Sequence, residues 1–300
     1  MPVASNSVRR ARPLLGTFVE IEASGATEAR MNAGIDAAFT AIAAVHSLMS
    51  FHESGSDVGR LNRLAGARPV RVHAWTWQVL KTAAELHRRC AGLFDVTVAS
   101  VLQDLKLLPG DPHRLRPGAT NSATGIDLLP DQYVRFRHAD MRIDLGGIAK
   151  GFAVDRALDV LCRHGMDTGL INAGGDVAVF GSDPWMIDLR DPRDPRHVIC
   201  RMFLKDSGLA SSGAYFDLFD ATELGGSTII DPRSRQVVQR FPGATVRARS
   251  CMIADALTKI VMIAGRDAAP LLAHYGADAI MVLPDGALEM TCGFENALAA

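Results

Sequence analysis

The spacing of apolar residues along the chain predicts both strands and helices. Residues 14–23 (LLGTFVEIEA) alternate apolar and polar side chains and are rich in β-forming residues, which is typical of a strand. In residues 26–50 the apolar positions recur at helical spacing over several turns, so a long helix is expected next. Two more helices are expected at 74–92 and 148–165, each ending at a glycine, because glycine readily ends a helix.

The second half of the chain adds mainly short β-like runs. Residues 168–181 (TGLINAGGDVAVFG) predict a strand, a glycine turn and a second strand. Further strands are expected at 185–191, 197–206, 227–232, 244–248 and 279–284, and helices at 252–264 and 267–275. Strand and helix runs mix without regular β-α-β alternation, which favours an α+β fold with a mixed β-sheet core flanked by helices.

Two passages are rich in turn-forming residues, namely 108–125 and 189–197, and both are expected to be loops. Neither is long enough to predict a domain linker. With 300 residues, the chain has room for one large domain or two closely packed ones. We therefore expect a single domain over 1–300, with room for a smaller inserted or flanking subdomain.

The composition places the chain among soluble globular proteins, with 48% hydrophobic and 22% charged residues. Its 32 Lys and Arg balance 33 Asp and Glu, so no charged surface of the kind that binds nucleic acid is indicated. Small-molecule or protein partners are expected instead. No apolar run approaches the roughly 20 residues that span a bilayer, and the N-terminus lacks an export signal. A cytoplasmic protein without a transmembrane segment is therefore expected.

The cysteines give no sign of a disulfide framework or a structural zinc site. Cys90, Cys162, Cys200, Cys251 and Cys292 are odd in number and widely scattered, and no two of them form a CxxC pair. Reduced thiols are the simplest interpretation.

A first candidate site lies in residues 143–155 (IDLGGIAKGFAVD). Gly146 and Gly147 lead into a helix that carries Lys150 in its first turn. Glycines let the backbone approach a ligand closely, a helix N-terminus favours anions, and a lysine adds a point charge suited to phosphate. The segment indicates a diphosphate or carboxylate site, although an ordinary glycine-rich helix start gives the same pattern, and neither P-loop nor GxGxxG spacing is present.

Two further candidates have simpler interpretations beside them. In INAGGD a plain hairpin turn is the better interpretation of the segment alone. In ASSGAYFD and STIIDPRS, small hydroxyl residues and a glycine allow a flat ring or a phosphate to lie against the backbone, but such residues are also common in loops. No GxSxG sequence is present, which disfavours a serine hydrolase. The candidate ligand contacts from these segments are Gly174, Gly175, Asp176, Ser212, Gly213 and Thr228.

Residues 250–265 (SCMIADALTKIVMIAG) place a carboxylate in an otherwise apolar helix. Asp255 shares one helix face with Thr258 at i+3 and Lys259 at i+4. An isolated charge in an apolar setting is costly, so Asp255 needs a partner. Its carboxylate and the Thr258 hydroxyl can hold Mg²⁺, which prefers oxygen ligands. Alternatively, Asp255 and Lys259 form an i,i+4 ion pair, which is the better interpretation of this segment alone.

The nine histidines are scattered and form no HExxH or His-x-His motif. His52 follows the first long helix in a polar loop, FHESGSDVGRLN. A solvated loop histidine is the simpler interpretation, and stacking on a flat ring is the alternative.

Taken together, these segments resemble the ApbE family of flavin transferases. The resemblance covers most of the chain and rests on eight segments in the family's order: LLGTFVEI, LMSFHESGSDVGRLN, GLFDVTV, DLGGIAKGFAVDRA, INAGGD, ASSGAYFD, IIDPRS and CMIADALTK. It implies a T-fold-related architecture and transfer of an FMN unit from FAD to a Thr or Ser hydroxyl of a target flavoprotein, with release of AMP. In such a transfer at a diphosphate, positioning and charge neutralisation supply most of the catalysis. Family members are often exported, and a homodimer is a further expectation.

The resemblance also implies roles for individual residues. FAD binding is expected from Leu15, His52, Leu93, Phe94, Asp95, Asp144 and Lys150. Mg²⁺ is expected at the backbone carbonyl of Gly147, the carboxylate of Asp255 and the hydroxyl of Thr258. Lys150 and Asp255 are the expected catalytic residues, the first holding phosphate and the second assisting the metal or activating the acceptor hydroxyl.

This chain departs from the family pattern at several of these positions. Leu15 stands where the family commonly has Met, and His52 stands where it commonly has Tyr. Before IIDP, where the family often has His, this chain has Ser227 and Thr228. Lys259 replaces the usual Thr. An ammonium beside Mg²⁺ weakens metal binding by like-charge repulsion, on the order of 4 kcal/mol at about 4 Å with an effective dielectric near 20. The alternatives to a transferase are therefore a metal-independent, non-catalytic FAD-binding relative and an FAD hydrolase that yields FMN and AMP.

Overall fold

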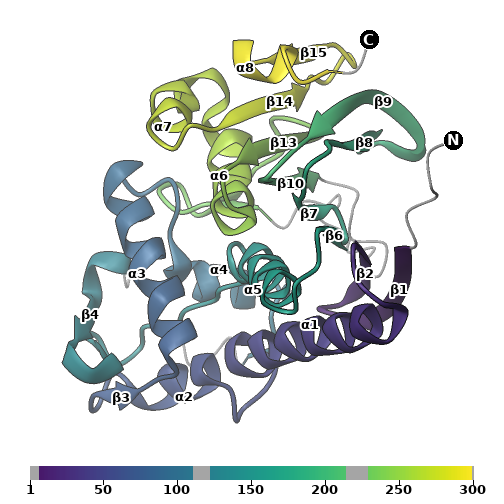
Figure 1. The fold of residues 1–300 in the computed structure, drawn as a ribbon. Helices are drawn as coiled ribbons and strands as arrows, with labels where there is room; N and C mark the ends of the chain where they lie inside the picture. Colours follow the sequence, from purple (N-terminus) through teal and green to yellow (C-terminus); the bar gives the residue numbers. More distant parts are fainter. Residues whose placement is uncertain (1–6, 111–121, 214–228, 299–300) are drawn as a thin grey trace, which may run out of the picture. The chain divides into compact units, whose positions relative to one another are not determined.

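The computed structural model describes residues 7–110, 122–213 and 229–298, and the chain divides into two compact units (Figure 1). Unit 1 comprises Met1–Ala44, Lys150–Gly226 and Arg240–Ala300. Unit 2 comprises Val45–Ala149 and Ser227–Gln239. The expected single domain stays a prediction.

Unit 1 is built on an eight-stranded sheet with the order β1-β2-β6-β7-β10-β13-β14-β15 (Figure 1). Every neighbouring pair in it is antiparallel, which refines the expected mixed sheet. The inner strands are buried on both faces over most of their length, because protein layers cover both. The strands are β1 (Ser7–Leu14), β2 (Thr17–Ser24), β6 (Thr168–Ala173), β7 (Asp176–Phe180), β10 (Ser207–Gly213), β13 (Gly243–Ala248), β14 (Asp278–Val282) and β15 (Leu288–Met290).

The predicted strand over 14–23 is instead a turn followed by a strand. Leu15 and Gly16 form a two-residue hairpin turn, and both have positive φ, at 57° and 72°. The partner strand β1 was not predicted because its burial alternates only between exposed and half-buried positions. An edge strand that buries no full face leaves no apolar signal in the sequence.

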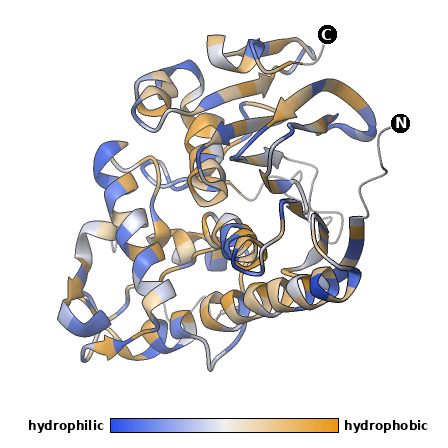
Figure 2. Cartoon of the chain, in the orientation of Figure 1, coloured by the Kyte–Doolittle hydropathy of each residue, from blue (hydrophilic) through white to orange (hydrophobic). Residues whose placement is uncertain are grey.

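Helices in unit 1 agree with the apolar spacing. The predicted helix at 26–50 is confirmed as α1 (Glu28–Met49), which begins in unit 1, and the one at 148–165 as α5 (Ala149–Arg163). The helix α6 (Cys251–Ala264) confirms the prediction at 252–264; Figure 2 shows how apolar it is. It packs on strands β10 and β13. The remaining helices are η5 (Gly265–Ala268), α7 (Ala269–His274) and α8 (Cys292–Glu295).

A long hairpin, β8 (Trp185–Asp191) and β9 (Asp194–Leu204), carries its own apolar side chains to the main sheet. The loop expected at 189–197 is wrong, because the Asp191 carboxylate accepts the Arg193 N–H at 2.8 Å and confines the turn to two residues. Pairing continues on both sides of that turn. The resulting core cluster contains Val177, Val179, Leu189, Met202, Leu204, Leu209, Ile280, Phe294 and Ala297.

Unit 2 is mainly helical, with a small sheet of order β3-β5-β4. The helix predicted at 74–92 is confirmed as α3, although it ends at Arg89. Of the strand predicted at 227–232, the described residues form only β11, which pairs with β12. The elements are α2 (Asp57–Leu64), β3 (Val70–Arg71), α3 (Ala74–Arg89), η1 (Val96–Val98), α4 (Ala99–Asp104), η3 (Ala123–Gly125), β4 (Ile126–Leu129), η4 (Pro130–Gln132), β5 (Tyr133–Phe136), β11 (Ile230–Asp231) and β12 (Gln236–Val237).

Two buried polar side chains organise unit 2. The Asp57 carboxylate accepts the His73 N–H at 2.7 Å and the Thr76 hydroxyl at 2.8 Å, which ties α2 to the start of α3. The Asn62 amide exchanges two hydrogen bonds with the backbone of Ile143, at 2.8 and 2.9 Å. The segment after His52, which was expected to be a polar loop, therefore contains the helix α2 with two structural polar residues, and the sequence alone did not reveal this.

All five cysteines are free thiols. Across the ranges that the structure describes, no helix has both the length and the apolar character needed to cross a membrane.

Candidate functional site

The N-terminus of α6 is held in place by close backbone packing in unit 1. A Cβ on Gly151 of α5 would lie 2.3 Å from the carbonyl oxygen of Cys251, and a Cβ on Gly208 of β10 would lie 2.3 Å from the amide nitrogen of Cys251. Real Cβ atoms do not approach so closely, so both positions require glycine. The first residue of α6 is thus fixed from two sides.

The carboxylate of Asp155 on α5 caps the same helix. It accepts the N–H groups of Cys251 at 2.8 Å and Met252 at 3.0 Å, while the Ser250 hydroxyl accepts the N–H of Ile253 at 3.2 Å. These bonds satisfy three of the free N–H groups at the helix N-terminus. Burial raises the pKa of Asp155 to about 6, although the hydrogen bonds oppose this shift. The capping role of Asp155 was not predicted, even though it lies within the first candidate segment.

Asp255 lies one turn into α6 and is fully buried. Its Oδ2 accepts the N–H of Gly151 at 3.0 Å, and its Oδ1 forms an ion pair with the Lys259 ammonium. Thr258 is also fully buried; its hydroxyl donates to the backbone carbonyl of Asp255 at 2.7 Å and accepts from the Ser212 hydroxyl at 2.7 Å. The i,i+4 ion pair is confirmed, and every side-chain oxygen of Asp255 and Thr258 has a protein partner.

A second buried carboxylate, Asp176, lies at the start of β7. Only 1% of its side chain is exposed, and neither of its oxygens has a hydrogen-bond partner. The Lys150 ammonium is 3.5 Å from its Oδ2. Burial raises the pKa of Asp176 to about 7, with Lys150 opposing and Asp255 adding to the shift. The charge of Asp176 in turn raises the pKa of Lys150, so the lysine stays cationic at neutral pH.

The hairpin-turn interpretation of INAGGD is confirmed, and the ligand-binding role of this segment stays a prediction. Gly174 and Gly175 form a two-residue hairpin turn with φ of 62° and 96°, which only glycine adopts easily. A Cβ on Gly174 would lie 2.7 Å from the hydroxyl of Thr17, so this turn lies beside the end of the β1–β2 hairpin that carries Leu15. The hairpin therefore places the Asp176 carboxylate as well as turning the chain.

Unit 1 thus gathers candidates from five separate segments at one end of its sheet, namely Leu15, Lys150, Gly174–Asp176, Ser212–Gly213 and Asp255–Thr258. Ser212 and Gly213 lie at the end of β10, and Ser212 reaches Thr258 on α6. Leu15 is half-buried in its turn, where its positive φ is strained for a leucine, and its FAD-binding role stays a prediction. Thr228, like Ser227, lies outside the described residues.

The candidates in unit 2 form two groups, one around Asp95 and one at the start of the glycine motif. Asp95 is buried and caps η1: its Oδ1 accepts the N–H and the hydroxyl of Thr97, both at 2.7 Å, and its Oδ2 accepts the Ala123 N–H at 3.1 Å. His87 lies 3.2 Å from the same carboxylate. Phe94 is buried and Leu93 is half-buried. The FAD-binding roles of these three residues remain predictions, and for Asp95 the hydrogen bonds supply a structural role.

The second group in unit 2 surrounds the start of the glycine motif. Asp144 is half-buried, and its Oδ2 accepts the N–H of Gly146 at 3.0 Å. Burial raises the pKa of Asp144, and the hydrogen bond from the Gly146 N–H and the charge of His52 oppose that shift. His52 is exposed, with its ring edge against Phe51. Gly147 is half-buried in the turn before α5, and its metal-ligand role stays a prediction.

A search with protein-family models matches the ApbE family over residues 15–282. The chain belongs to the ApbE family. Curated relatives include a Treponema pallidum protein named FAD:protein FMN transferase, 26% identical over 95% of this chain and 86% of its own length. A Vibrio cholerae protein of the same name is 30% identical over 74% of this chain and 71% of its own.

Solved ApbE structures share the fold. The crystal structure of the ApbE protein of Thermotoga maritima superposes with a TM-score of 0.86 and is 26% identical, with 98% of this chain and 100% of that chain covered. The flavin transferase ApbE of Vibrio cholerae gives a TM-score of 0.82 at 24% identity, with the same coverage. The predicted α+β class and ApbE-like architecture are therefore confirmed.

Mg²⁺, which the ApbE resemblance implies, does not fit the two side chains predicted to hold it on α6, Asp255 and Thr258, as they are arranged. Mg²⁺ requires several oxygen ligands in octahedral geometry. The oxygens of Asp255 are bound to Gly151 and Lys259, and the Thr258 hydroxyl is bound twice. Within the described ranges, no group of three or more His, Cys, Asp or Glu side chains is arranged to hold a metal ion. Any reaction at this site is therefore derived from its side chains alone.

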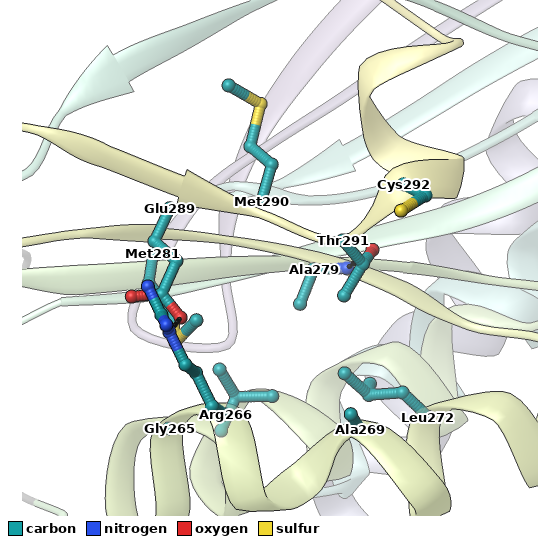
Figure 3. Close-up of a pocket in the computed structure, with 11 residues that line it drawn as sticks. Gly265, Arg266, Ala269, Leu272, Ala279, Met281, Glu289, Met290, Thr291 and Cys292 are labelled. Atoms are coloured by element: carbon teal, nitrogen blue, oxygen red, sulfur yellow. Dashed lines mark hydrogen bonds and ion pairs between the residues drawn. The ribbon is translucent and has the colours of Figure 1, made fainter.

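A separate pocket of about 400 Å³ lies at the other end of α6 in unit 1 (Figure 3). Its walls are largely apolar, from residues such as Val261, Leu272 and Met281, and the ion pair of Arg266 with Glu289 lies at its side. None of the residues predicted for the functional site lines it. The pocket is thus distinct from the site that the ApbE motifs form.

Proposed function

We propose that this chain is an FAD:protein FMN transferase that moves the FMN unit of FAD to a Thr or Ser hydroxyl of a target flavoprotein and releases AMP. Membership in the ApbE family and the names of the curated relatives support the transferase assignment. The observation that carries it onto this chain is the cluster of Lys150, Asp176 and Asp255 at one end of the sheet in unit 1. The cluster combines the Lys150 ammonium, which stays charged at neutral pH, with the buried Asp176 carboxylate, which has no hydrogen-bond partner.

The proposed reaction forms one P–O bond and breaks another. The acceptor hydroxyl oxygen bonds to the phosphorus on the FMN side of the diphosphate, and the bond from that phosphorus to the bridging oxygen breaks. AMP leaves with the bridging oxygen and its electron pair, and the hydroxyl proton passes to a base. Catalysis of such a transfer rests on positioning and on neutralising the charge of the diphosphate.

We assign phosphate binding to Lys150 and proton acceptance to Asp176. About a third of the Lys150 side chain is exposed, at 32%, so its ammonium can reach a ligand while it stays near Asp176. Asp176 has two oxygens without hydrogen bonds, whereas both oxygens of Asp255 are occupied. The role of Asp255, predicted from the resemblance as catalytic, then becomes to hold Lys259 and the N-terminus of α5 in place.

The test is a transfer assay on a target flavoprotein domain that contains the acceptor Thr. Intact mass spectrometry after incubation with FAD is expected to show the mass of one added FMN, and a Thr→Ala variant of that acceptor is expected to show none. Lys150→Met of the enzyme should lower the rate at least about tenfold, because a charged hydrogen bond is worth about 1.5–3 kcal/mol. A wild-type enzyme that adds no FMN but converts FAD to FMN and AMP would be a hydrolase. FAD binding with neither product would leave only a binding protein.

A further inference from the structure

We propose that the ammonium group of Lys259 takes the place of a divalent cation in this site, so that the chain binds FAD without Mg²⁺. The proposal rests on the proposed function, because it concerns how the same site receives the diphosphate. It starts from the mismatch between the donor atoms of α6 and a magnesium site.

Lys259 occupies an oxygen of Asp255 that a metal would need. Its ammonium is ion-paired to Oδ1 of Asp255 from the next turn of the same helix. Oδ2 of Asp255 is used by the Gly151 N–H, and that bond is fixed because α5 and α6 touch at Gly151. A metal that bound Asp255 would first have to displace Lys259.

The charges of the cluster balance without a metal ion. Asp176 and Asp255 are both buried and their charges interact, so together they require positive charge nearby. Lys150 pairs with the first carboxylate and Lys259 with the second, and the charge of Lys259 also acts on Asp176. When both carboxylates are ionised, their two negative charges and the two ammonium charges sum to zero. Adding Mg²⁺ would leave two excess positive charges beside an ammonium, which repels it.

Lys259 can still bind a ligand while it is paired with Asp255. Its side chain is 21% exposed, whereas Asp255 beside it is fully buried, so the lysine is the part of the pair that a ligand can reach. An ammonium group offers three N–H donors and a point charge, which suit phosphate oxygens. Lys150 and Lys259 together would then neutralise the diphosphate that a lysine and a metal would otherwise neutralise.

The experiment is a calorimetric titration of the full chain with FAD, once with Mg²⁺ and once with EDTA. The wild type is expected to bind FAD with the same affinity, within about twofold, in both conditions. Lys259→Thr supplies a metal-ligand hydroxyl in place of the ammonium, so it should bind FAD at least about tenfold more weakly in EDTA and recover with Mg²⁺. Lys259→Met removes the charge without adding an oxygen ligand, so Mg²⁺ should not restore its affinity.

A second readout needs no FAD. The melting temperature of the wild type should not change on adding Mg²⁺, whereas that of Lys259→Thr should rise, because a ligand that binds only the folded state stabilises it. Lys205→Thr, an exposed site between β9 and β10, controls for the loss of a lysine and should behave as the wild type. If the Lys259 variants do not fold, the FAD titration and the melting temperature of the wild type, each with and without Mg²⁺, still test the proposal.

The outcomes separate this proposal from the proposed function. FAD binding by the wild type that strengthens about tenfold or more with Mg²⁺, or a rise in its melting temperature with Mg²⁺, would overturn the role of Lys259 and leave the transferase intact. No binding of FAD in either condition would refute the proposed function, and this proposal with it.

Discussion

Replacing Gly151 by alanine tests the helix contact that positions the site. The added Cβ would meet three atoms: the carbonyl oxygen of Cys251 at 2.3 Å, its carbonyl carbon at 2.7 Å and the Cβ of Asp255 at 2.8 Å. Ordinary Cβ contacts begin near 3.4 Å. The helices α5 and α6 must therefore separate by about 1 Å, since backbone atoms cannot rotate away as a side chain can.

Two effects of opposite sign decide how much Gly151→Ala changes the free energy of unfolding. Alanine stabilises a helix by about 1 kcal/mol relative to glycine. Overpacking of a well-packed contact costs about 1–3 kcal/mol, and the upper end applies here because the clash is with backbone. The expected net loss is about 2 kcal/mol, which lowers the melting temperature by about 4–8 °C for a unit of this size.

The assay is thermal unfolding followed by circular dichroism, with FAD titration beside it. Gly55→Ala is the control, because a Cβ there meets nothing within 4 Å, and it should leave stability within about 0.5 kcal/mol. Gly151→Ala should also weaken FAD binding, since the Gly151 N–H bond to Asp255 lengthens as the helices part. A variant as stable as the wild type, or more stable, would show that helix propensity outweighs the clash and that the packing argument is wrong.

Three further predictions follow from the buried carboxylates. Burial raises the pKa of Asp155 to about 6, above the value near 4 of a carboxyl in the unfolded chain. The contribution of Asp155 to the free energy of unfolding should therefore fall as the pH rises from about 4 to 6. The unfolding midpoint of Asp155→Asn, measured over the same pH range, should lack this fall. With Asp176 as the base, the transfer rate should rise with pH through about 7, and a rise that persists in Asp176→Asn would rule out that role. Asp95→Ala breaks three hydrogen bonds and should cost about 3 kcal/mol in urea unfolding, whereas weaker FAD binding at unchanged stability would indicate a direct ligand contact instead.

Local patterns in the sequence were enough for the long helices and the buried strands. Met31, Ile35, Ile42 and Val45 recur on one face of α1, and only a helix brings that spacing to one side. The strands β7 (DVAVF) and β14 (DAIMV) are nearly continuous apolar runs, which also identifies them locally. By contrast, β1 and the two-residue turn of the β8–β9 hairpin depend on pairing with a partner strand, and apolar spacing does not encode that pairing.

The sequence by itself determined the α+β class, the main helices, the family and the pairing of Asp255 with Lys259, because that pair is separated by one helical turn. Only the tertiary structure decided that Asp176 lies beside Lys150, that Asp155 caps α6, and that two glycines far apart in the chain both contact Cys251. These contacts join residues that are 26 to about 100 positions apart, as for Lys150 with Asp176 and Asp155 with Cys251. Their geometry follows from how α5, α6 and the sheet pack, and the charge and shape of single segments do not specify it.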